Sequence, residues 1–496
     1  MPKQKTILIV TSESVPYAKS GGLADVTGAL SKSLAERGHR VIVVMPYYAS
    51  ISKELTQSDQ SPISMNVWMG DTEEWCLAYP KKINKNLEYY FIEFEKYFHR
   101  GGMYCNRAQQ DYSDNHKRFA FLSQAAMYLC KSKQIKVDVV HAHDWQTAAA
   151  LAYLKIHHWN DSCLGEAAGV LTIHNMGFQG KYPKTDYNYL GFREEDFNPD
   201  VFEDYGEVNL LKGGIHFADI VNTVSPTYAL ETLTDAHSFG LHNYLKAKGD
   251  NYLGILNGVD YEDWDPNNDS LIAQTYNSAN MAGKKICKKD LRDHFSLDHN
   301  EAPIIGVVSR MAEQKGLNIL ANSIEAIINN MHVQFVILGS GDKYLEAYFT
   351  ALAKKYPGKI GVQIGYNNIL AHKIEAGADF FIMPSRYEPC GLNQIYSLRY
   401  GTLPIVRATG GLQDTVEQYN EKTGDGTGFK FFDLNERAIF DTVGWAVSTW
   451  FDRPDHYKAM QKRAMTRSFS WNDSAQKYEE VYDRAIASRK VYFKSK

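Results

Sequence analysis

The sequence lacks several features that would place it in a specialised class of protein. Its six cysteines are scattered, without a Cys-x-x-Cys pair or a zinc-binding spacing, which indicates free thiols in a reducing compartment. No run approaches the ~20 apolar residues of a membrane-spanning helix. The first apolar run, Ile7–Val10, is too short for the core of a signal peptide. We therefore expect a cytoplasmic protein with no membrane partner.

An excess of charge of one sign is also missing. Lys+Arg 54 against Asp+Glu 58 leaves a formal net charge of −4, so no nucleic-acid partner is expected. The composition, with 44% hydrophobic and 23% charged residues, is that of a folded protein. A chain of 496 residues exceeds what one hydrophobic core supports, and two domains are therefore expected.

Two successive series of short apolar runs predict two parallel sheets. The runs show no alternation, as is typical of strands buried on both faces, and helical periodicity lies between them. The first series comprises Thr6–Thr11, Arg40–Met45, Val137–His141, Gly169–Ile173 and Asp219–Val224. The second comprises Ile304–Val308, Gln334–Leu338, Val362–Ile364, Phe380–Met383 and Pro404–Val406.

This pattern predicts an α/β protein with two doubly wound, Rossmann-like domains that face each other across a cleft. We expect the first domain at residues 1–254, the second at 255–473, and a C-terminal helix at 474–496 that packs back across the join. Turn dipeptides at Asn257-Gly258 and Asp265-Pro266 mark the join. In such folds ligands bind beyond the carboxyl ends of the strands, so the loops there are expected to carry the chemistry.

Glycines and cations gather in these loops. Lys19-Ser20-Gly21-Gly22 leads into a helix of the first domain, while Arg310 and Lys315 share one loop of the second. Paired glycines let the backbone approach a ligand, and fixed cations stabilise the charge of a departing diphosphate. The two loops together predict a pyrophosphate clamp. For the glycine loop taken alone, a flexible strand–helix connection is the alternative.

Two further loops follow late strands of the second domain. The stretch Ser385–Leu392 contains Glu388 and Gly391 and leads into a helix, and Thr409-Gly410-Gly411-Leu412 opens the next. A helix N-terminus attracts anions through its free N–H groups and its dipole. We therefore predict two anion-binding helix N-termini beside one carboxylate. The alternative is that these are ordinary loops between strand and helix.

Two patterns could indicate a metal, but we predict none. His141 and His143 face the same side of a strand, yet no matching set of Asp, Glu or His partners accompanies them. Asp263-Trp264-Asp265 has the DxD spacing of metal-dependent transferases. Because it lies in the turn-rich join, we interpret it as structural.

In their order and spacing, these motifs resemble those of bacterial glycogen synthases and plant starch synthases. The resemblance spans nearly the whole chain and rests on Lys19–Leu23, His141–Trp145, Thr172–Asn175, Leu256–Asp260, Ser309–Gly316, Glu388–Leu392 and Thr409–Leu412. It implies the glycosyltransferase B fold and transfer of glucose from ADP-glucose to the non-reducing end of an α-1,4-glucan, with retention of configuration. It also implies that no metal or other cofactor takes part. The chain departs from the family by having serine in place of the usual threonine at Ser20.

The resemblance also implies roles for individual residues. Glu388 would contact the transferred glucose, and the main-chain carbonyl of His174 would stabilise its positive charge. Arg310 and Lys315 would hold the donor phosphates. The implied donor-binding residues are Lys19, Gly21, Gly22, Asp25, Asn257, Tyr366 (stacked on adenine), Gly391, Leu392, Thr409, Gly410 and Gly411. The implied acceptor-binding residues are Tyr104, Asp144 and Trp145.

Other functions stay open at this point. A nucleotide-sugar epimerase of similar fold, or another retaining transferase, would share the donor loops. Against a catalytically silent glucan-binding protein stands the joint presence of four charged residues in these loops, namely Lys19, Arg310, Lys315 and Glu388. A glycogen phosphorylase would need a pyridoxal phosphate lysine motif, which the sequence does not contain. Tyr396 stands where sucrose- and trehalose-type transferases carry a second glutamate.

Overall fold

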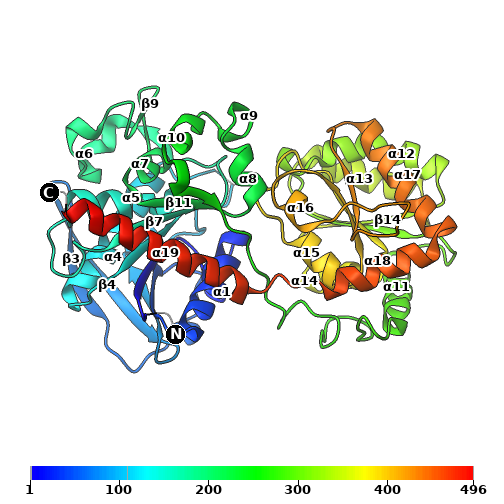
Figure 1. The fold of residues 1–496 in the computed structure, drawn as a ribbon, viewed down its shortest axis with the longest axis horizontal. Helices are drawn as coiled ribbons and strands as arrows, with labels where there is room; N and C mark the ends of the chain where they lie inside the picture. Colours follow the sequence, from blue (N-terminus) through cyan, green and yellow to red (C-terminus); the bar gives the residue numbers. More distant parts are fainter. Residues whose placement is uncertain (1–2, 109, 495–496) are drawn as a thin grey trace. The chain divides into compact units, whose positions relative to one another are not determined.

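A computed structural model describes residues 3–108 and 110–494, and the chain divides into two compact units (Figure 1). Unit 1 comprises Met1–Val224, Ala229–Gly258 and Trp471–Lys496, and unit 2 comprises Ser225–Tyr228 and Val259–Ser470. The chain thus leaves unit 1 at Gly258, four residues after the expected boundary, and returns to it at Trp471.

Unit 1 is built on a nine-stranded sheet in the order β12-β11-β7-β6-β1-β2-β5-β4-β3. The strands from β12 to β5 are parallel to their neighbours, and β4 and β3 are antiparallel. The bounds are β1 Thr6–Val10, β2 Arg40–Pro46, β3 Ile63–Met69, β4 Thr72–Lys82, β5 Leu87–Glu93, β6 Val139–His143, β7 Ala168–Ile173, β11 Ile220–Thr223 and β12 Tyr252–Gly254. The expected strand at Val137–His141 lies two residues later, so His141 and His143 are both within β6.

Among the residues that the structure describes, five helices of eight residues or more accompany this sheet: α1 Gly22–Glu36, α4 Asn115–Ser132, α5 Asp144–Ile156, α7 Leu210–Phe217 and α19 Trp471–Lys494. Shorter ones are α2 Lys53–Thr56, α3 Glu95–Phe98, α6 Tyr187–Leu190, α9 Asp235–Ser238 and α10 His242–Ala247, whereas α8 Pro226–Glu231 belongs partly to each unit. A small sheet contains β8 Lys181–Pro183, β9 Glu203–Asp204 and β10 Glu207–Asn209. The C-terminal helix α19 packs on α1, β6, β7 and β11, and therefore completes unit 1 (Figure 1).

Unit 2 is a Rossmann-like fold around a six-stranded parallel sheet in the order β15-β14-β13-β16-β17-β18. The strands are β13 Ile304–Val308, β14 Gln334–Gly339, β15 Ile360–Ile364, β16 Phe380–Met383, β17 Leu403–Arg407 and β18 Phe429–Phe431. The helices are α11 Ala282–Phe295, α12 Leu317–Asn330, α13 Lys343–Lys355, α14 Asn368–Gly377, α15 Asn393–Arg399, α16 Gly410–Thr415, α17 Glu436–Asp452 and α18 Pro454–Thr466.

Apolar side chains of this second sheet pack on both of its faces. Ile305 and Val307 contribute to a cluster with α12 and α17, whereas Ile304 contributes to a second cluster with α11 and α14. Because successive side chains of a strand point to opposite faces, a strand covered on both sides must be apolar throughout. This is why the continuous apolar run Ile304–Val308 predicted β13 with its observed bounds.

Candidate active site

The chain order of the strands reverses at one place in unit 2, between β13 and β16. A cavity of about 160 Å³ lies at the carboxyl ends of these two strands, which is where Rossmann-like folds bind ligands. It is lined by Val308, Ser309, Arg310, Lys315, Leu317, Ile382, Met383, Pro384, Ser385, Glu388, Gly391, Leu392 and Asn393. Five of the predicted site residues therefore share one cavity: Arg310, Lys315, Glu388, Gly391 and Leu392.

An ion pair joins the two loops that form this cavity. Lys315 Nζ donates to both carboxylate oxygens of Glu388, at 2.9 Å to Oε1 and 2.7 Å to Oε2. Ser385 Oγ donates to Oε2 at 2.9 Å. The Glu388 side chain is 6% exposed and that of Lys315 is 18% exposed, so water screens the pair only weakly. The site thus holds a buried carboxylate against a cation.

Glycines bring the backbones of these loops together. Gly316 has φ +65°, and a Cβ there would lie 1.9 Å from the carbonyl oxygen of Pro384. At Gly410, with φ +45°, a Cβ would lie 2.0 Å from the carbonyl oxygen of Glu388. The N–H of Gly411 donates to that same oxygen at 3.0 Å. A side chain at any of these positions would push Glu388 or its neighbours aside.

This packing changes the interpretation of the predicted anion-binding helix N-termini. Helices α15 and α16 have only 7 and 6 residues. The N–H of Gly411 is already bonded to protein, while Thr409 is buried at the N-cap of α16. The glycine pair therefore has a structural role in seating the loop of Glu388, and a phosphate contact at Thr409 to Gly411 stays a prediction.

The remaining predicted donor residues differ in their surroundings. Tyr366 follows β15 and is 83% exposed, with its hydroxyl bonded to Asn368. Asn257, at the end of unit 1, is buried, and its Oδ1 has no hydrogen-bond partner within the described residues. Gly21 has open space where a Cβ would stand. Tyr366 and Gly21 are thus accessible to a ligand, whereas the unpartnered amide oxygen of Asn257 is buried.

The strand order of the sheet in unit 1 reverses at β1, next to β6. The loop after β1 contains Lys19, whose Nζ lies 2.7 Å from Asp25 Oδ1. Lys19 is half exposed, so this pair is accessible to an anion that could exchange with the carboxylate. Gly22 begins α1 directly after it. The predicted residues Lys19, Gly22 and Asp25 are thus brought together at the start of one helix.

Glu13 is a buried carboxylate of this loop that the sequence reading missed. Its Oε1 accepts hydrogen bonds from Ser20 Oγ at 2.9 Å and from the Tyr104 hydroxyl at 3.1 Å, and its Oε2 accepts the main-chain N–H of Ser20. Burial raises the pKa of Glu13. Its position, three residues after an apolar strand, could have identified it in the sequence, because the loops at the carboxyl ends of the strands were expected to carry the site.

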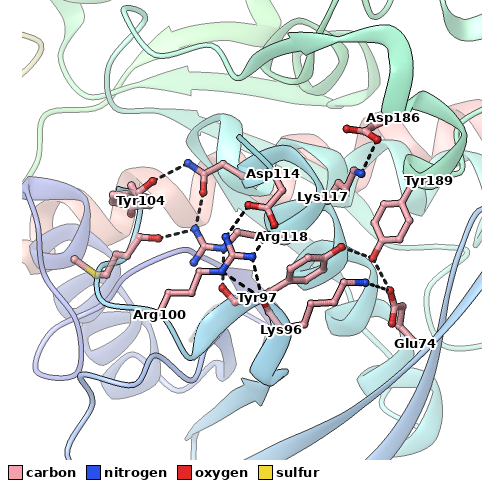
Figure 2. Close-up of polar contacts among 12 residues, drawn as sticks. Glu74, Lys96, Tyr97, Arg100, Tyr104, Asp114, Lys117, Arg118, Asp186 and Tyr189 are labelled. Atoms are coloured by element: carbon pink, nitrogen blue, oxygen red, sulfur yellow. Dashed lines mark hydrogen bonds and ion pairs between the residues drawn. The ribbon is translucent and has the colours of Figure 1, made fainter. Parts of the chain in front are cut away.

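Tyr104 is held in place by a buried arginine beneath its loop. Asn115 Nδ2 donates to the carbonyl of Tyr104 at 2.8 Å, and Arg118 donates to Asn115 Oδ1. Figure 2 shows Arg118 and Tyr104 within this group of polar contacts. Arg118 also donates to the carbonyls of Met103 at 2.9 Å and Tyr97 at 2.7 Å. Burial lowers the pKa of Arg118. A long-range network therefore fixes the loop that brings the Tyr104 hydroxyl to Glu13.

Asp144 orients the backbone after β7. It has φ +56° at the end of β6, and its Oδ1 accepts the N–H of His174 at 2.6 Å and that of Asn175 at 3.4 Å. Burial raises the pKa of Asp144 to about 7. The carboxyl group therefore sets the peptide geometry at His174, the residue whose carbonyl was predicted to stabilise the sugar.

Trp145 is enclosed by neighbouring aromatic rings. Its side chain is buried, with its ring 5.6 Å from that of Phe119 and 5.7 Å from that of Tyr182 between centroids. A Cβ at Gly180 would clash with the same ring. Trp145 therefore packs in the core of unit 1, and its contact with a glucan stays a prediction.

The two candidate metal patterns have other partners. Trp264 stacks between the rings of His372 and Tyr396, at 3.8 and 4.0 Å, and Asp265 pairs with Arg399, which agrees with the structural interpretation of Asp263–Asp265. Across residues 3–108 and 110–494, no group of three or more His, Cys, Asp or Glu side chains is placed to hold a metal ion. In those same ranges, no helix has both the length and the apolar character needed to span a membrane.

Known proteins resemble the chain over its whole length. The family model "Starch synthase catalytic domain" matches residues 6–247, and "Glycosyl transferases group 1" matches residues 290–466. Glycogen synthase 1 of Geobacter metallireducens is 46% identical, covering 98% of this chain and 97% of its own. Glycogen synthase of Treponema denticola is 43% identical, covering 97% and 99%.

Solved structures agree. The catalytic domain of starch synthase IV from Arabidopsis thaliana, bound to ADP and acarbose, matches with a TM-score of 0.88 at 29% identity, covering 98% of this chain and 100% of that one. Sucrose-phosphate synthase from Thermosynechococcus elongatus matches with a TM-score of 0.60 at 16% identity, which indicates a shared fold alone. The loops built from the residues above and these matches lead to one conclusion: the chain belongs to the family of bacterial glycogen synthases and plant starch synthases, with the glycosyltransferase B fold.

Proposed function

We propose that the protein is a retaining hexosyltransferase that moves glucose from ADP-glucose to the non-reducing end of an α-1,4-glucan. The observation that carries this proposal is the cavity at the carboxyl ends of β13 and β16. Arg310, Lys315 and Glu388 all line it, and Lys315 forms an ion pair with the buried carboxylate of Glu388. Departure of a nucleoside diphosphate creates negative charge on the phosphate and positive charge on the sugar. The cations match the first of these charges and the carboxylate matches the second.

In this proposal Lys315 changes partners during donor binding. Without a donor its ammonium group is shared between the two oxygens of Glu388. A diphosphate in the cavity would attract Lys315 together with Arg310, since both are cations of the same loop. Glu388 would then be free to face the sugar, where a preorganised charge acts on the transition state without reorganisation. Ser385 would keep the carboxylate in position.

For unit 1 we propose a role on the sugar side. Asp144 fixes the amides of His174 and Asn175, and so orients the carbonyl proposed to stabilise the sugar cation. Tyr104 and Glu13 form a hydroxyl–carboxyl pair of the kind that recognises sugar hydroxyls. We propose that they bind the acceptor glucan.

The choice of donor is proposed from Tyr366. Its aromatic ring is 83% exposed after β15 and would bury most of its area against a purine base. We therefore propose that ADP-glucose is preferred over UDP-glucose. We also propose that no divalent metal is required, because Arg310 and Lys315 supply positive charge to the leaving diphosphate.

A transfer assay with radiolabelled donors tests these proposals. ADP-[¹⁴C]glucose and UDP-[¹⁴C]glucose are supplied in parallel with glycogen, with and without excess EDTA. We expect label in the polymer from ADP-glucose, little effect of EDTA, and release of that label by an amylase specific for α-1,4 bonds. Label found only in free sugar or in an epimer would overturn the transferase proposal. Equal kcat/KM for the two donors would overturn the donor preference alone.

A further inference from the structure

Three histidine rings lie in a row in unit 1. His141 and His143 are on β6, with ring centroids 4.1 Å apart, and His174 follows β7, with its ring 5.3 Å from that of His143. Burial lowers the pKa of all three, to about 3 for His141 and His174. Each ring is therefore neutral at physiological pH and carries one proton, on one of its two nitrogens.

The proton of His141 can be placed from its neighbours. The carbonyl of Thr223 can only accept a hydrogen bond, so the group of Asn222 that faces it is the donor Nδ2. The other end of this amide, Oδ1, is therefore an acceptor, and it accepts the Thr172 hydroxyl at 2.9 Å. That hydroxyl has one hydrogen, so its oxygen accepts from His141 Nε2–H at 2.7 Å. His141 Nδ1 in turn accepts the hydroxyl of Tyr482, on α19, at 2.9 Å. Both nitrogens of His141 are thus satisfied.

His143 and His174 share a single proton. His143 Nδ1 lies 3.0 Å from His174 Nε2, and one of the two must donate. The other nitrogen of His143, Nε2, is buried and has no partner among the described residues. If His174 were the donor, the proton of His143 would sit on Nε2 as an orphaned buried N–H, which proteins rarely tolerate. If His143 Nδ1–H is the donor, only a lone pair is left unpartnered, at lower cost.

We propose that His143 is a positioning residue that holds His174 as its Nδ1–H tautomer. His174 is partly exposed, and no hydrogen bond to its Nδ1 is found within the described residues. The Nδ1–H is therefore a fixed donor available to an oxygen of the substrate's sugar. This use of the donor rests on the proposed function, whereas the tautomer is a property of the protein without substrate.

The tautomer is measured directly by long-range ¹H–¹⁵N NMR on protein labelled at its histidine rings. The signals of His174 are assigned by comparison with a His174→Gln variant. We expect His174 to be protonated at Nδ1 and bare at Nε2. A proton on Nε2 would overturn the proposal, whatever the enzyme's activity. Conversely, a failure of the proposed function would show in the transfer assay and leave the spectrum unchanged.

Variants at His143 test whether the tautomer matters for activity. His143→Asn places an amide N–H near the position of Nδ1 and should keep most of kcat. His143→Gln reaches the position of Nε2, and His143→Leu supplies no donor, so both should lower kcat by about 10-fold or more with little change in donor KM. If His143→Leu does not fold, the contrast between Asn and Gln decides.

His158→Asn is the matched control. His158 is also a buried neutral histidine of unit 1, and its Nε2 bonds to Gln124 while its Nδ1 has no partner among the described residues. Its substitution should leave the tautomer of His174 and kcat unchanged. Equal kcat for the Asn, Gln and Leu variants of His143 would overturn the positioning role.

Discussion

Replacing Glu388 with glutamine removes one charge from the cavity of unit 2 while keeping the side chain's size. The carboxylate accepts two bonds from Lys315 and one from Ser385. A glutamine keeps one acceptor oxygen and turns the other into a donor. At least one of the three donors would therefore face an N–H group and lose its bond.

The size of the effect follows from this geometry. A hydrogen bond to a charged group contributes about 1.5–3 kcal/mol, and the pair is largely buried, so we expect the free energy of unfolding to fall by about 2 kcal/mol. The effect on catalysis should be larger, because loss of a group that meets developing charge lowers kcat by about 10²–10⁴-fold. The donor KM should change less, since other loops supply most of the proposed donor contacts.

The assay compares kcat from the transfer reaction with stability from urea unfolding. Glu375→Gln is the matched control: this carboxyl of α14 is buried in the same unit and accepts Ser397 Oγ at 2.7 Å. Burial raises its pKa to about 8, so near pH 7 glutamine replaces a mostly neutral acid, away from the cavity lining. Both kcat and stability should stay close to those of the unchanged enzyme. A folded Glu388→Gln enzyme with near-normal kcat would refute the reasoning.

Three further outcomes are expected. Gly410→Ala should lower kcat and reduce stability by about 1–3 kcal/mol, because its Cβ meets the carbonyl of Glu388. The Cβ of Gly21→Ala meets no atom within 4 Å, so this variant should raise the donor KM without lowering Tm. An equal loss of Tm for the two variants would contradict this account. Asp144→Asn keeps the acceptor for the amide of His174. Burial raises the pKa of Asp144 to about 7, so the folded unchanged enzyme favours the protonated carboxyl. The stability that this gives is fully present below pH 4 and is lost as the pH rises to 7, by up to about 4 kcal/mol relative to the variant. Urea unfolding across this pH range measures the difference, and parallel pH profiles would disprove the shift. Arg118→Met removes the donor to the buried carbonyl of Tyr97 and to the partly buried carbonyl of Met103, so it should cost about 2–4 kcal/mol and raise the KM for glycogen more than that for the donor. A rise in donor KM alone would argue against its role in holding Tyr104.

Strands buried on both faces were predictable because their signal is local. The runs Ile304–Val308 and Phe380–Met383 matched β13 and β16 in both bounds. Strands β3, β4 and β5, within residues 63–93, were missed. In β3 and β4 buried positions alternate with more exposed ones, so they lack the continuous apolar run that marked the others. Strands β3 and β4, at the edge of the sheet in unit 1, therefore lack the local signal that marks its central strands.

By itself, the sequence determined most of the strands that are buried on both faces, the parallel parts of the two sheets and which residue types follow these strands. These depend on local apolar patterning and on the rule that parallel α/β sheets place ligands at the carboxyl ends of their strands. They sufficed to select Arg310, Lys315 and Glu388 as candidates.

Only the tertiary structure decided which side chains meet and in what environment. Lys315 and Glu388 are 73 residues apart in the chain, and Glu13 reaches Tyr104 across 91 residues. The same holds for the burial of Trp145 and for the raised pKa of Asp144. Pairing and desolvation depend on every segment that packs around a group, and such long-range packing has no local signature in the chain.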